Sequence, residues 1–125
     1  MENKTKQTYD LEERLLSYGA QIIVLTRSLS TEYAERHVGN QLLRSGTAPL
    51  SHHGEAQAAE SPADFTHKMR LALKELREAE RWLKLIARAG LGPSNLNLKP
   101  LLDETDQLVR IFVSSIATAE KRRTK

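Results

Sequence analysis

The chain has no cysteine among its 125 residues, and only 5% of its residues are aromatic. The absence of cysteine excludes disulfides, thiol catalysis and zinc sites built on Cys, and it fits a reducing cytoplasm. Few aromatic residues beside 39% hydrophobic residues predict an aliphatic, helical core. The length predicts a single domain over residues 1–125, large enough to bury a core of its own.

Long apolar runs are also missing. The longest is 22–25, which is far too short to span a membrane. The first ten residues, MENKTKQTYD, contain no apolar segment of the kind that a secretory signal needs. We therefore expect a cytoplasmic protein without a membrane partner. Its formal net charge of +3 permits binding to nucleic acid but does not require it.

The clearest helix is predicted over residues 61–89. Ser61 is a suitable N-cap, Pro62 fits the first helical position, and Asp64 carries a charge that favours the helix start. Gly90 is a suitable C-terminal stop. Apolar residues recur at spacings of three and four, as on the buried face of a helix in a bundle: Phe65, Met69, Ala72, Leu76, Ala79, Leu83 and Ile86.

A second apolar group lies beside that face and comprises Leu71, Trp82 and Leu85. It predicts either a wider core or a subunit interface, because Trp is enriched in both.

The third face of this helix, opposite the core, is a row of basic residues: Arg70, Lys74, Arg77, Arg81, Lys84 and Arg88. Like charges four residues apart repel one another by a few tenths of a kcal/mol per pair. The row therefore predicts binding to phosphates, and the alternative is an ordinary solvated face.

Three further helices are predicted, over residues of about 9–29, 31–59 and 98–121. Gly46, Pro49 and Gly54 disfavour a regular helix, so residues 46–54 taken alone are interpreted as a loop or kink. Because residues 55–60 again favour helix, the alternative is one helix kinked near residue 49. Four helices with short connections predict an all-α, antiparallel up-and-down four-helix bundle.

No catalytic, metal-binding or cofactor-binding pattern is found. His52 and His53 are adjacent, so on a helix they point about 100° apart and cannot share a metal. None of the four His has a Glu three residues before it, which excludes the di-iron pattern of helical bundles. We expect a protein that is not an enzyme and holds no cofactor or metal.

Several segments together resemble the four-helix bundle proteins of the 23S rRNA intervening-sequence family, over residues of about 10–118. They are QLLRSGT at 41–47, EAQ at 55–57, SxxDF at 61–65 with Lys68, ALKE at 72–75, EAE at 78–80 and WL at 82–83. The chain departs from the family pattern at 48–56, where His52 replaces an Asn, and at Arg81, which replaces a Tyr.

This resemblance implies a bacterial homo-oligomer, a homopentamer in known relatives, of mostly unknown function. It also favours a helix through Pro49. The related accessory variability determinant of diversity-generating retroelements binds nucleic acid and a reverse transcriptase. Arg44 and Glu55 match charged positions of the family, and we expect each to pair with another helix or subunit.

The leading hypothesis is a non-enzymatic, homo-oligomeric bundle that binds RNA or DNA through the basic row, with a protein partner beside it. The alternative is a protein–protein adaptor or scaffold with no nucleic-acid role, which docks its partner on the group of Leu71, Trp82 and Leu85.

Overall fold

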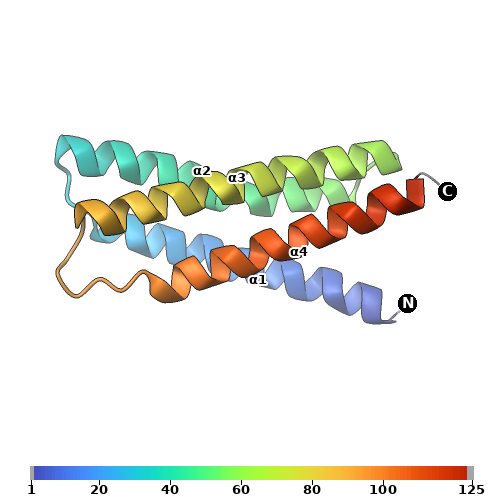
Figure 1. Cartoon of the computed structure of the whole chain (residues 1–125), viewed down its shortest axis with the longest axis horizontal. Helices are drawn as coiled ribbons and strands as arrows, with labels where there is room; N and C mark the ends of the chain where they lie inside the picture. The colour runs from blue at the N-terminus through green and yellow to red at the C-terminus, as the bar shows by residue number, and fades with distance from the viewer. Residues whose placement is uncertain (1, 124–125) are drawn as a thin grey trace.

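The computed structural model describes the backbone of residues 2–123 and the side chains of residues 10–123. It contains four helices, α1 (Glu2–Ser28), α2 (Tyr33–Gln57), α3 (Pro62–Ala89) and α4 (Lys99–Arg123). Successive helices run in opposite directions, so the start of α1 and the end of α4 lie at the same end of the bundle (Figure 1). The predicted all-α antiparallel four-helix bundle is confirmed, and residues 2–123 contain no strand.

The interpretation of residues 46–54 as a loop is wrong, because α2 continues through Pro49. A proline inside a helix costs about 3 kcal/mol, and glycine costs about 1 kcal/mol relative to alanine. Gly46, Pro49, His53 and Ala56 are all buried on the inner face of α2. The free energy gained by burying this face in the bundle outweighs the local cost of Pro49 and Gly46. Helix propensity alone does not include that gain. The first helix also differs from the prediction, because α1 begins at Glu2 rather than near residue 9.

Gly46 allows α1 and α2 to approach closely. A Cβ atom at Gly46 would lie 2.7 Å from Cγ1 of Ile22 and 2.9 Å from its Cγ2. One turn away, a Cβ at Gly19 would lie 3.9 Å from Thr47. The close approach of α1 to α2 therefore depends on Gly46, whereas the contact at Gly19 is an ordinary van der Waals distance.

The core lies along the apolar face predicted for α3. Met69, Leu76 and Leu83 are at most 2% exposed, and only Phe65, at the helix start, is half-buried. From α1 and α4, Tyr18 and Phe112 are among the largest fully buried side chains.

A buried hydrogen bond joins α1 to α4. The Tyr18 hydroxyl lies 2.7 Å from Oγ1 of Thr105, and burial raises the pKa of Tyr18 to about 12. Nearer the surface, the Arg14 guanidinium donates to both carboxylate oxygens of Glu104.

The predicted ends of α3 are confirmed. The Ser61 hydroxyl accepts the backbone N–H of Asp64 at 3.0 Å, and Pro62 is the first helical residue. Gly90 ends the helix with φ of 68°, a left-handed conformation that favours glycine. These caps hold the predicted register of α3, which decides where its basic residues point.

Candidate nucleic-acid interface

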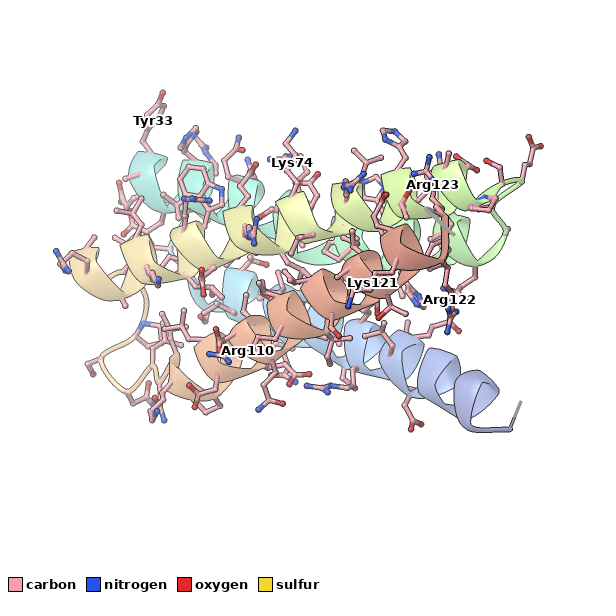
Figure 2. The ribbon with its side chains drawn as sticks, turned by 45° about the vertical axis from the view of Figure 1, so that its right-hand side comes forward. Tyr33, Lys74, Arg110, Lys121, Arg122 and Arg123 are labelled. Atoms are coloured by element: carbon pink, nitrogen blue, oxygen red, sulfur yellow. The ribbon has the colours of Figure 1, made fainter. Side chains whose placement is uncertain are left out.

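The six residues of the basic row are exposed on the outer face of α3, opposite its buried face. Two are ion-paired: Arg70 lies 3.1 Å from a Glu120 oxygen, and Lys84 lies 3.9 Å from Glu80. The other four form no ion pair with a carboxylate of residues 10–123, and they are Lys74, Arg77, Arg81 and Arg88. Lys74 projects outward from the middle of α3 (Figure 2).

A groove of about 620 Å³ runs between α3 and α4 beneath this row. Its α3 side carries Arg70, Lys74, Arg77 and Arg81, together with the half-buried Leu73. Its α4 side is mostly apolar and consists of Val113, Ile116, Ala117 and, at one end, Glu120. Sequence reasoning missed the α4 side, because the register between two helices cannot be read from either helix alone.

Glu120 closes one end of the groove. Besides Arg70, it contacts Arg123 at 3.2 Å, and Arg123 also donates to the Thr66 hydroxyl at 3.4 Å. This cluster ties the end of α4 to the start of α3. Arg122 is exposed in the same last turn of α4, but it points away from α3 and toward the α1 side of the bundle (Figure 2).

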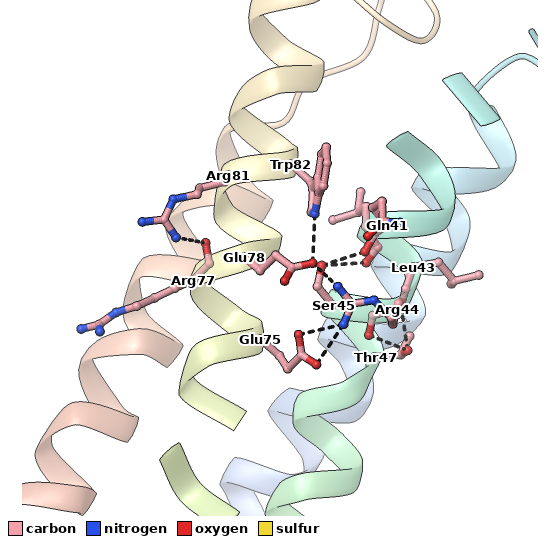
Figure 3. Close-up of polar contacts among 11 residues, drawn as sticks. Gln41, Leu43, Arg44, Ser45, Thr47, Glu75, Arg77, Glu78, Arg81 and Trp82 are labelled. Atoms are coloured by element: carbon pink, nitrogen blue, oxygen red, sulfur yellow. Dashed lines mark hydrogen bonds and ion pairs between the residues drawn. The ribbon is translucent and has the colours of Figure 1, made fainter. Parts of the chain in front are cut away.

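The opposite side of α3 is bound to α2 through Arg44 (Figure 3). Its guanidinium lies 3.1 Å from each carboxylate oxygen of Glu75 and also donates to Glu78. The Trp82 indole N–H donates to Glu78 at 3.2 Å. Arg77 projects from the other side of the helix (Figure 3), so the two charge systems of α3 are separate.

Glu55 has a partner on another helix as well, since Lys68 of α3 lies 3.8 Å away. Its second contact is His52 at 3.4 Å, within α2. Arg44 and Glu55 thus each join α2 to α3 within one chain.

The three residues considered for an oligomer interface have different surroundings. Trp82 meets His37 of α2 edge to face, with ring centroids 6.1 Å apart, and packs against the core. Leu71 is half-buried, and Leu85 is 44% exposed. Within one chain Trp82 therefore packs at the edge of the core, and the oligomer interface through Leu71, Trp82 and Leu85 stays a prediction.

Several large apolar side chains of α1 are also exposed, and the sequence analysis did not single them out. Leu16, Ile23 and Val24 are 45%, 39% and 64% exposed. Leu43 of α2 is 37% exposed and lies three residues from Gly46, the point where α2 contacts α1. A helical wheel of α1 that separates these residues from the core positions would have found them.

His53 is buried and incompletely hydrogen-bonded. Its Nε2 lies 3.3 Å from the Gln57 amide nitrogen, whereas its Nδ1 has no partner. Burial lowers the pKa of His53, and the Phe112 ring lies against it. Residues 10–123 contain no group of three or more His, Asp or Glu side chains placed to hold a metal ion.

None of the helices, over the part of the chain that the structure describes, is long and apolar enough to cross a membrane.

Comparison with known proteins places this bundle in a family. No curated protein matches the chain. Among solved structures, a protein of unknown function of the S23 ribosomal protein family from Bacteroides thetaiotaomicron is 28% identical, with a TM-score of 0.78. That match covers 88% of this chain and 97% of the Bacteroides protein. The profile of the family described as 23S rRNA-intervening sequence protein matches residues 9–114. The chain belongs to the 23S rRNA-intervening sequence protein family.

Proposed function

We propose that this protein is a non-enzymatic, cytoplasmic homo-oligomer that binds the phosphate backbone of RNA or DNA through the basic row of α3. The observation that carries the proposal is the set of four exposed row cations without a carboxylate partner among residues 10–123. They span Lys74 to Arg88, about 21 Å at about 1.5 Å per residue. Phosphates along a nucleic-acid backbone would relieve the repulsion between these cations.

The family supports this direction without naming a ligand. Its description links it to 23S rRNA. The resemblance to the accessory variability determinant, which binds nucleic acid, points the same way.

Homo-oligomerisation, to a pentamer as the resemblance implies, would present several copies of the row at once. Linked copies bind more tightly than one because the later contacts become intramolecular. The exposed Leu16, Ile23, Leu43 and Leu85 are apolar surface available for such association. Light scattering tests the subunit number directly, and a monomer at micromolar concentration would remove this part of the proposal.

The test of binding is fluorescence anisotropy with a labelled structured RNA and a DNA duplex across a salt series. If the four unpaired cations each neutralise a phosphate, log K should fall with log salt with a slope of about −3 to −4 on duplex DNA. Arg77→Glu/Arg81→Glu should reduce that slope by about 2 and abolish binding at physiological salt.

The matched control is Arg27→Glu/Arg36→Glu, which changes the net charge equally at two exposed arginines on α1 and α2. The control should retain most of the affinity. Binding that survives the α3 double substitution would remove the proposed interface. If neither nucleic acid binds at low salt, the adaptor function takes its place, with the docking surface of Leu71, Trp82 and Leu85.

A further inference from the structure

The groove beneath the basic row combines two surfaces that a duplex would not use together. One side, on α3, is mostly cationic, and the other side, on α4, is apolar except for Glu120 at one end. Val113 is 42% exposed there, and Leu73 is half-buried. A phosphate backbone satisfies the cations, but it offers nothing to the aliphatic side chains.

We propose that the α3–α4 groove is a site for single-stranded nucleic acid, with phosphates along Lys74, Arg77 and Arg81 and unpaired bases over Val113 and Leu73. This inference rests on the proposed function and specifies its ligand class. In a duplex the base faces are stacked on one another, and the outer surface near the protein is sugar and phosphate. Only an unpaired nucleotide exposes a flat apolar face beside its phosphate.

The distribution of charge across the groove orients the strand. The groove-lining cations all come from α3, and on the α4 side the one charged lining residue is Glu120. Phosphates would therefore lie over α3, and bases would point toward α4. The cationic edge from Arg70 to Arg81 is about 16 Å long, at about 1.5 Å per residue. The groove volume of about 620 Å³ lies within the range of about 300–1,000 Å³ typical of ligand sites.

Glu120 sets the number of phosphates that this groove can neutralise. It already pairs with Arg70 at 3.1 Å, which leaves three groove cations for the strand. Single strands release about 0.7 counterion per neutralised phosphate, so the salt slope for groove binding should be about −2.

The experiment compares a labelled single-stranded oligonucleotide with a duplex of the same sequence and length, by anisotropy, on the full chain. Val113→Ser removes apolar groove surface without changing charge. Val24→Ser is the matched control, because Val24 is an exposed valine on α1 outside the groove. Circular dichroism checks that both variants remain helical.

We expect wild type to bind the single strand more tightly than the duplex. Val113→Ser should weaken single-strand binding about fourfold, the effect of losing roughly one buried methyl group of apolar contact, with the salt slope unchanged. Duplex binding and the Val24→Ser variant should remain at wild-type affinity.

The possible failures are distinguishable. If single strand and duplex bind equally and Val113→Ser changes neither, the groove inference is wrong while the proposed function stands. If wild type binds neither, both fail. Poly-glutamate that binds the chain more weakly after Val113→Ser would reassign the groove to an acidic protein segment. A smaller oligomer formed by Val113→Ser alone would reassign it to a second copy of the chain.

Discussion

Replacing Gly46 with alanine tests the close contact between α1 and α2. In an open helix position this change stabilises by about 1 kcal/mol, because glycine is a poor helix former. At Gly46 the new Cβ would lie 2.7, 2.9 and 3.0 Å from three carbon atoms of Ile22. Ile22 is fully buried and β-branched, so its side chain has little freedom to move away.

The same substitution at Gly54 is the matched control on the same helix. Gly54 is exposed, and a Cβ there meets nothing within 4 Å. Gly54→Ala should therefore stabilise by about 0.5–1 kcal/mol. Overpacking a core costs about 1–3 kcal/mol, so the free energy of unfolding of Gly46→Ala should be lower than that of Gly54→Ala by about that amount.

Urea denaturation followed by circular dichroism measures both variants, at one fixed protein concentration because association contributes to apparent stability. A double-mutant cycle identifies the cause. Ile22→Ala alone should cost about 2–5 kcal/mol. Combined with Gly46→Ala it should cost less than the sum, since the added methyl occupies space that Ile22 left. A Gly46→Ala protein as stable as Gly54→Ala would refute the close-contact reasoning.

Three further predictions concern single side chains. Because the pKa of His53 is lowered in the folded protein, as pH falls the His53 side chain of the unfolded chain binds a proton at a higher pH, near the ordinary value of 6.5, than that of the folded chain. The free energy of unfolding should then drop by up to about 1.4 kcal/mol per pH unit, and thermal melts at pH 5–7 should show this component missing in His53→Leu. Ser61→Ala removes the hydroxyl that caps α3 and should cost about 1 kcal/mol in urea denaturation, whereas an unchanged midpoint would assign the cap no energetic role. Arg44→Ala leaves Glu75 and Glu78 without their shared cation and should cost about 1 kcal/mol, and unchanged melting and assembly would contradict a structural role.

Helix-by-helix features could be predicted from the sequence because they depend on local periodicity. The buried face of α3, its Ser61 cap and its Gly90 stop are where the pattern placed them. Periodicity also separated the basic row from the core, because positions three and four apart share a face of any helix.

Residues 46–54 show where local reasoning fails. Gly46, Pro49 and Gly54 all weaken an isolated helix, yet the segment is helical. Gly46 is needed where Ile22 of another helix approaches, and this requirement is visible only once the two helices are packed. Tertiary burial outweighs propensity here because it acts on the whole inner face of α2.

The sequence by itself therefore determined the fold class, the faces of α3 and the absence of a recognisable catalytic pattern. Only the tertiary structure decided which residues of α4 lie beside the basic row. It also decided the ion pairs between helices, namely Arg70 with Glu120 and Arg44 with both Glu75 and Glu78. The reason is physical. A helix's own faces follow from the 3.6-residue repeat, whereas the register between helices is set by side-chain packing across the bundle.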